Sequence, residues 1–430
     1  MVVETEPNAV LRRLARLRAQ YETFAENPHA RLLRWRIADD ERRMVDALVA
    51  MENHEELMQT ADLWVPLHSP FESADEHGWV LRRELVAEYE RARADEPAGV
   101  MLAWAPPPTP RQTNDIDALI TLATSLAEYH GDLMEHLTLV LQPPSIADTS
   151  AWSAWLARLV PRLPAEIRVI VPDAIESALL DELATTEPLR VLDCTAALDM
   201  DGAYLELSEG TDAQTSPAAE LRRAFVRMMV AGRHGDVEAA VGIGLPALAT
   251  ATREGWWEQV ATLHFGMGAL YDDADELESA REHYQGAYIA GARARGQSEA
   301  AAGPIRVHAR MAGASAALRQ ERWDEAAPEF EAAATLAQTR SDLRTAHEGW
   351  RLACHAHAQA ERDMEAWRCG EAALRCGEAL PVDQRAHSTL RYTGDSLLAL
   401  RDRSAPPPEV PLDPDTLPSR LEAALGPGWR

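Results

Sequence analysis

The sequence predicts a mainly α-helical chain of several domains, with N-terminal helices, a small parallel α/β domain and a C-terminal solenoid of helix hairpins. Three observations predict this class. Apolar residues at helical spacing dominate both ends of the chain. Four short apolar runs alternate with helical segments over about residues 97–208. A helix pattern anchored on alanine repeats between about residues 215 and 400.

The composition is that of a globular protein with an acidic surface. Hydrophobic residues make up 46% of the 430 residues, enough for more than one core. The 69 acidic residues outnumber the 42 basic ones, which argues against a nucleic-acid binder. Every basic residue is arginine, so mechanisms that need lysine are excluded, including the P-loop phosphate contact and Schiff-base chemistry. A coding bias explains the missing lysines better than selection against their modification, although the sequence leaves both open.

We expect a cytoplasmic protein without membrane insertion. No apolar run approaches the roughly 20 residues that span a bilayer, and the first residues, MVVETEPNAVLRRLARL, lack the apolar core of a signal peptide. The cysteines form no CxxC pair, so we interpret them as buried thiols and expect neither disulfides nor a metal cluster with the neighbouring His355 and His357. They are Cys194, Cys354, Cys369 and Cys376.

Residues 1–96 predict helices. Apolar residues recur every three or four positions over Glu6–Glu26 and again over Arg31–Met58. Pro66 interrupts the pattern. Ser69-Pro70-Phe71-Glu72 then combines an N-cap serine, a first-turn proline and a capping-box glutamate, which predicts a helix from there to about Ala94.

Residues 97–208 predict a small domain of four parallel strands joined by helical crossovers. The expected strands are Val100–Ala105, Leu137–Leu141, Ile167–Val171 and Leu189–Leu192. The expected helices are Asp115–Tyr129, Thr149–Leu163 and Ile175–Ala184.

Two aspartates follow strands of this domain, where parallel sheets bind ligands. Asp173 and Asp193 faintly resemble the metal-binding aspartate of P-loop ATPases. After the first expected strand, however, the chain reads PPPTPRQTND and contains neither GxxxxGK[ST] nor GxGxxG. The resemblance therefore implies a degenerate, non-hydrolysing NTPase-like module, and we expect no bound cofactor. The two aspartates remain the only strand-end candidates for one.

The C-terminal repeat has regular anchors. Ala240, Ala280, Ala326 and Ala366 are spaced by 40, 46 and 40 residues, and each is followed at four and seven residues by further small or aromatic side chains. These offsets resemble the tetratricopeptide repeat, most clearly in the unit with Gly268, Tyr271, Ala280, Tyr284 and Ala287.

The resemblance implies a concave groove lined by the first helix of each hairpin. The positions that it assigns to the groove are Arg222, Phe225, Met229, Phe265, Asp272, Met311, Arg319, Arg351 and His355. Such a mixture of Met, Phe and Arg suits recognition of a protein or peptide. The lysine–asparagine clamp of members that bind chaperone tails cannot form in a chain without lysine.

Residues 401–430 predict a Pro-rich linker and a short helix over Ser419–Leu425, which either folds back on the solenoid or docks elsewhere. We expect a non-enzymatic adaptor or chaperone-like scaffold that binds a protein partner, for instance a bacterial effector or assembly component. The alternative is a nucleotide-linked regulator whose α/β domain is coupled to the repeats. A hydrolase lacks support, because neither GxSxG nor HExxH occurs. The sequence does not indicate an oligomeric state.

Overall fold

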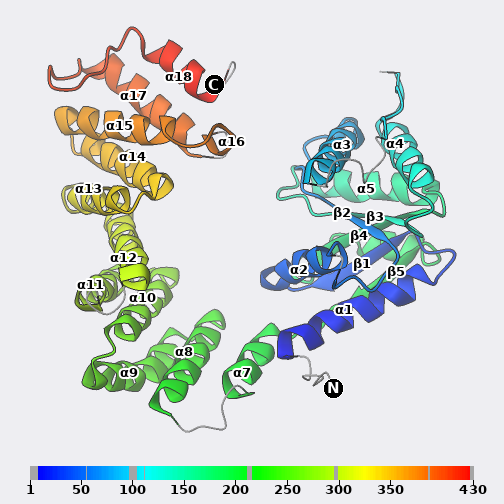
Figure 1. Cartoon of the computed structure of the whole chain (residues 1–430), viewed down its shortest axis with the longest axis horizontal. Coiled ribbons are helices and arrows are strands. Elements are labelled where there is room, and N and C mark those ends of the chain that lie inside the picture. The colour runs from blue at the N-terminus through cyan, green and yellow to red at the C-terminus, as the bar shows by residue number, and fades with distance from the viewer. Residues whose placement is uncertain are drawn as a thin grey trace. The chain divides into compact units, whose positions relative to one another are not determined.

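The computed structural model describes residues 8–54, 56–95, 104–110, 112–210, 216–294, 299–385 and 388–426. The chain divides into two compact units, Met1–Leu207 and Ser208–Arg430. The first holds a small parallel sheet with helices, and the second is a run of packed helix hairpins (Figure 1). This confirms the expected class. No helix among the described residues is long and apolar enough to cross a membrane.

The first unit is built on a five-stranded sheet in the order β2-β3-β4-β1-β5, and all of its strand pairs are parallel. The strands are β1 (Leu32–Ile37), β2 (Leu63–Leu67), β3 (Leu137–Leu141), β4 (Ile167–Ala174) and β5 (Val191–Thr195). The three expected strands at 137–141, 167–171 and 189–192 are thus confirmed. The second of them extends to Ala174, and the third begins at Val191 and extends to Thr195. Residues 100–103 of the fourth expected strand lie outside the described residues, and Trp104 is not in a strand.

Helices cover both faces of this sheet because its strands alternate their apolar side chains between two cores. Leu33, Trp35 and Ile37 of β1 belong to the core beneath α1 (Ala9–Ala25), α2 (Arg43–Glu52) and α7 (Met200–Gly210). Leu32 belongs to the opposite core. That core is covered by α3 (His77–Asp95), α4 (Asp115–Tyr129), α5 (Thr149–Leu159) and α6 (Asp181–Thr186).

The expectation that residues 1–96 are all helical is wrong, because β1 and β2 come from this stretch. In β1 the side chains of Leu33 and Ile37 are four residues apart, a spacing that fits one face of a helix and also one face of a strand. Pro66 lies inside β2 rather than in a break. A proline is tolerated there because β2 is an edge strand, so the N–H group that Pro66 lacks is not needed for a hydrogen bond in the middle of the sheet.

The expected capping box at Ser69–Glu72 is also wrong. Phe71 forms a parallel bridge with Ile146 instead of opening a helix, and α3 begins at His77. Phe71 is 1% exposed and its ring packs edge-on against Trp152, so burial of the aromatic ring fixes this segment as an extension of the sheet. The helix expected over Ile175–Ala184 likewise starts later, at Asp181.

The second unit contains four hairpins in which consecutive helices pack against each other. Their first helices are α8 (Pro217–Arg233), α10 (Trp257–Asp273), α12 (Glu299–Arg319) and α14 (Leu343–Gln359). Their second helices are α9 (Val237–Glu254), α11 (Leu277–Ala294), α13 (Trp323–Thr339) and α15 (Asp363–Glu378). All four alanine anchors lie on second helices and are fully buried, which confirms the repeat register.

One left-handed residue closes every hairpin. Gly235, Asp275, Glu321 and Glu361 have φ between 57° and 80°, and each stands five residues before its alanine anchor. The chain bonds back across three of these turns in the manner of a Schellman motif, as when the Glu276 amide donates to the Tyr271 carbonyl at 2.8 Å. The repeat is therefore one of backbone geometry as well as of sequence.

The C-terminal segment folds back onto the last hairpin, which answers a question that the sequence left open. Val410, Leu412, Leu417 and Leu421 are buried in the same core as α15 and α17 (Leu390–Arg403). Arg420 on α18 (Leu417–Leu425) pairs with Glu378 through both carboxylate oxygens, at 2.6 and 2.7 Å. This segment covers an apolar end that a terminal repeat would otherwise expose.

Candidate functional site

The first helices of the hairpins lie together on one side of the second unit. Helix α10 packs against α8 and α12, whereas contacts between α12 and α14 and among α9, α11 and α13 are at most marginal in the described residues. Figure 1 shows α8, α10, α12 and α14 along one side and α9, α11 and α13 along the other. Helices on the inner side of a curved stack approach each other more closely. We call this side, formed by α8, α10, α12 and α14, the first-helix face.

The apolar residues predicted for the groove are half-buried and partly used for packing. Phe225 and Met229 on α8 close over Gly266, where an added Cβ would lie 3.2 Å from the Phe225 ring. Phe265 on α10 lies with its ring 5.4 Å from that of Tyr284. Met311 on α12 packs against two cores. Phe225, Met229 and Met311 therefore pack between hairpins, Phe265 packs within its own hairpin, and all four present only part of their surface.

The charged groove candidates form pairs within the unit. Arg319 donates to Asp272 and to Asp275, each at 2.6 Å, and so ties α12 to the end of α10. Arg351 pairs with Glu348 one turn earlier on α14, at 2.6 Å. The ring of His355 meets Trp323 edge-on at 6.1 Å. Arg222 is exposed on α8. The structure thus brings Asp272 and Arg319 together, while Arg351 and His355 make separate contacts.

The strand-end aspartates of the first unit converge on one arginine. Arg34 of β1 donates through Nε to Asp173 at 2.8 Å, and its two Nη atoms reach Asp181 at 2.5 Å and Asp193 at 3.5 Å. Asp173 also accepts from the amides of Leu179 and Leu180. Burial opposes the charge of Arg34, but its hydrogen bonds to Asp181 and Asp173 prevail and raise its pKa. Asp173 is thus occupied by protein donors.

The connections of the sheet reverse direction beside these residues. The crossover after β1 runs through α2 to β2 at one edge, and the crossover after β4 runs through α6 to β5 at the other. Open parallel sheets bind ligands at such a point. Here the loop after β1 carries Asp39, Asp40 and Glu41 instead of glycines. The acidic side chains of this loop oppose the approach of a phosphate. Burial raises the pKa of Glu41, against the hydrogen bond that it accepts from the Met200 amide, and nearby carboxylates raise it further.

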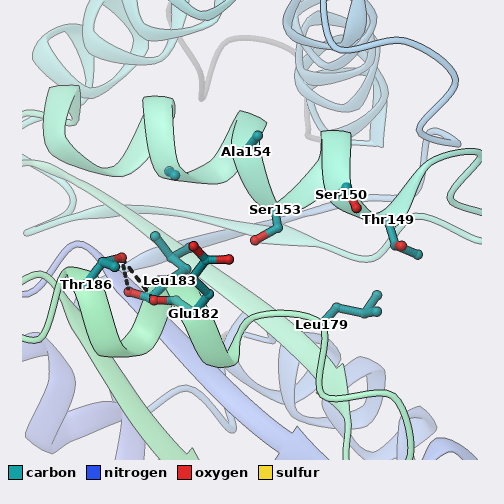
Figure 2. A pocket seen from close by; sticks show the side chains of 9 residues that line it. Thr149, Ser150, Ser153, Ala154, Leu179, Glu182, Leu183 and Thr186 are labelled. Carbon is teal, nitrogen blue, oxygen red and sulfur yellow. Dashed lines mark hydrogen bonds between the residues drawn. The ribbon is translucent and has the colours of Figure 1, made fainter.

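A cavity of about 410 Å³ lies between α5 and α6 (Figure 2). Its polar lining consists of the side chains of Thr149, Ser150, Ser153, Glu182 and Thr186. The Thr186 hydroxyl donates to the Glu182 carbonyl at 2.9 Å. Among the residues that the structure describes, no positively charged side chain lines this cavity, and neither Asp173 nor Asp193 belongs to the lining. It is therefore unsuited to the nucleotide phosphate that the strand-end aspartates suggested.

A smaller depression of about 210 Å³ lies between α11, α12 and α13. Arg310 stacks over the ring of Tyr288 at 4.1 Å and pairs with Glu329 at 2.8 Å. Burial acts to raise the pKa of Tyr288, but hydrogen bonds from Arg310 and Arg306 lower it below its usual value. The repeat resemblance did not select these residues, because Tyr288 and Glu329 lie on second helices and Arg306 and Arg310 do not occupy its groove positions on α12.

Three potential metal-binding side chains meet between the third and fourth hairpins. Glu331 on α13, His357 on α14 and Cys369 on α15 place one donor atom each within 4.8 Å of the others. His357 Nε2 lies 2.6 Å from Glu331 Oε1, and Arg368 donates to the other carboxylate oxygen at 2.9 Å. The sequence offers His357 and Cys369 as potential metal ligands, but the lack of a CxxC pair led to the expectation of no metal cluster. Glu331 was not considered, because it lies on a third helix and follows no ligand spacing.

Comparison with known proteins finds no matching family model and no matching curated protein. Among solved structures, the apo form of RapI is 12% identical with a TM-score of 0.39, and 67% of each chain is covered. BtubC from P. vanneervenii is 15% identical with a TM-score of 0.35, and the match covers 61% of this chain and 90% of the BtubC chain. A signal transduction ATPase with a tetratricopeptide repeat sensor from Pyrococcus horikoshii is 9% identical with a TM-score of 0.20, over 95% of each chain.

Proposed function

We propose that the chain is a non-enzymatic scaffold that binds a protein partner on the first-helix face, in the manner of tetratricopeptide-repeat adaptors. The observation that carries this proposal is the packing of α10 against α8 and α12. It makes one extended surface out of helices that would otherwise be separate. Such a surface suits a partner's helix or an extended peptide, since both need contacts spread over several repeats.

The side chains on this face favour an amphipathic ligand. Phe265 and Met311 are half-buried, so each retains apolar surface for a partner at little cost in side-chain ordering. The Asp272–Arg319 pair holds two hairpins in register between them. A partner with spaced apolar anchors and a polar flank would match this arrangement.

The absence of an enzyme mechanism is part of the proposal. Burial raises the pKa of Cys354 to about 12 and also raises the pKa of Cys369, so neither thiol is prepared to act as a nucleophile. The nucleotide-linked alternative would need a ligand site at the point where the connections of the sheet reverse direction. At that point the acidic loop after β1 and the Arg34–Asp173 pair disfavour a phosphate ligand.

The test is a binding measurement with the full-length protein and a partner recovered by cross-linking. Phe265→Ala and Met311→Ala should each weaken binding about tenfold or more, a loss of about 1.4 kcal/mol. Ile289→Ala is the control, because Ile289 is 45% exposed on the second helix α11. Thermal unfolding must show that all three variants fold. Weakening by Ile289→Ala alone would place the interface on the other side of the repeats.

A further inference from the structure

The Glu331–His357–Cys369 cluster lies where the third and fourth hairpins meet. Glu331 belongs to α13, the second helix of the third hairpin, and the other two residues belong to α14 and α15. A ligand held by all three side chains would therefore link two hairpins directly. Among the described residues, this is the cluster in which a carboxylate, an imidazole and a thiol place donor atoms within 4.8 Å of one another.

We propose that Glu331, His357 and Cys369 bind a divalent transition-metal ion, with zinc as the best match. One oxygen, one nitrogen and one sulfur donor form a ligand set that zinc accepts, and solvent can supply the fourth position. In a tetrahedral site, neighbouring donors stand about 3.3–3.6 Å apart, as bond lengths near 2.0–2.3 Å require. The observed donors lie within 4.8 Å of one another, and metal binding would separate His357 Nε2 from Glu331 Oε1, which are now 2.6 Å apart.

The charges around the cluster fit this assignment. Glu331 and the deprotonated Cys369 together balance a dication. Arg368 donates to the carboxylate oxygen opposite the one that faces His357, and it can keep this role while the other oxygen coordinates. Binding converts the Cys369 thiol into a metal-bound thiolate and releases its proton to solvent. The expected signature is thus the release of protons on metal binding.

Access to the cluster is from the Glu331 side. The Glu331 side chain is 24% exposed, while that of His357 is only 6% exposed and Cys369 is buried. A small hydrated ion can therefore reach the carboxylate first and then the two buried donors. The role that follows is structural, since the ion would fix the angle between two hairpins and hence the curvature of the first-helix face.

The experiment uses the full-length protein without a histidine tag, freed of metal by chelation. Titration with Co²⁺ is followed by absorbance, since only a thiolate ligand gives a sulfur-to-cobalt charge-transfer band in the near ultraviolet. We expect saturation at one equivalent, displacement of the band by Zn²⁺, and a rise in Tm with Zn²⁺. Cys369→Ser and His357→Gln should abolish the band. Each should also weaken Zn²⁺ binding more than about 10–100-fold, which is the effect of losing a hydrogen-bond partner that only supports a ligand.

Two controls separate the cluster from other donors. Cys354→Ser, a change of a neighbouring buried cysteine outside the cluster, should keep the band. The Asp62–Glu135–His136 group in the first unit contains no thiol and can produce no such band. If Cys369→Ser fails to fold, the C194S/C354S/C376S variant decides, because Cys369 is then the last thiol. Absence of the band in the wild-type protein, or its persistence in Cys369→Ser, would overturn the proposal.

Discussion

The ring of Tyr284 lies directly against Gly268, on the facing helices of the second hairpin. A Cβ added at Gly268 would come within 2.8 Å of two ring carbons of Tyr284. Two other helical glycines are covered in a similar way, Gly244 by Met267 and Met228 and Gly370 by Leu397 and Cys354. The absence of a Cβ at each of these positions makes room for a side chain of a neighbouring helix.

Gly268→Ala should destabilise the second unit by about 1–3 kcal/mol, because the new methyl group overpacks the crossing with Tyr284. Chemical denaturation monitored by circular dichroism measures this. Gly242→Ala is the matched control: Gly242 is also helical, and an added Cβ there meets nothing within 4 Å. That control should stabilise the protein by up to about 1 kcal/mol through helix propensity. Equal effects of the two changes would contradict the packing argument.

Glu361→Gly should stabilise the protein by up to about 1 kcal/mol, because Glu361 holds φ at 58° where glycine carries no steric penalty. The gain is limited by the greater freedom of glycine in the unfolded chain. Gly235→Ala alters the equivalent turn of the first hairpin and should destabilise by about 1 kcal/mol. The midpoints of urea unfolding of the two variants should therefore move in opposite directions.

The sequence predicted well those elements whose apolar spacing fits either a helix or a strand, but not both. Asp115–Tyr129 and Leu137–Leu141 match α4 and β3 at both ends, and the alanine anchors mark the second helices of all four hairpins. β1 was missed because Leu33 and Ile37 satisfy a helix and a strand alike. The start of α3 was misplaced because burial of Phe71 prevails over a local capping signal.

The sites depend on contacts that no local pattern contains. Asp272 and Arg319 are 47 residues apart, and their pairing follows from the angle between two hairpins. Arg34 was not a candidate, because its strand was expected to be a helix; the Asp173 and Asp193 candidates therefore lacked the partner that joins them. Glu331 joins His357 and Cys369 only after three helices have packed. Spacing identifies the helices, and their packing creates the clusters.

Asp173→Asn should destabilise the first unit by about 3–5 kcal/mol, because it leaves the buried Arg34 without its buried carboxylate partner. Asp181→Asn is the control on the same arginine. The Asp181 side chain is 67% exposed, so that change should amount to less than about 1 kcal/mol. Similar losses in the two variants, measured by denaturant unfolding, would show that Asp173 is not the partner that holds Arg34.

A panel of nucleotides with and without Mg²⁺ should leave the Tm of the wild-type protein unchanged, because the loop after β1 offers carboxylates where a phosphate would bind. Thermal-shift measurement at saturating ligand is the test. A rise in Tm that Asp193→Asn removes would support the nucleotide-linked alternative instead. Asp193 is the better probe, since changing Asp173 already affects folding.

The pair His264 and His283 should make stability fall with acidification. Their Nδ1 atoms lie 3.2 Å apart between α10 and α11. Burial, followed by the neighbouring His283, lowers the pKa of His264 from 6.5 to about 4. Burial also lowers the pKa of His283, against a smaller opposing effect of Glu282. Both imidazoles are therefore neutral in the folded protein at neutral pH.

A histidine whose folded pKa lies below its unfolded value binds its proton more readily in the unfolded chain, so unfolding is favoured as pH falls from about 6.5 toward 4. For His264 the loss across this window is at most roughly 3 kcal/mol. His264→Gln should flatten the dependence of unfolding free energy on pH, whereas His308→Gln, at an exposed position on α12, should leave it unchanged. Because other buried histidines titrate too, the decisive quantity is the difference in pH dependence of the unfolding free energy between these two variants. If the two variants show the same pH dependence, the His264–His283 pair does not influence stability in this pH range.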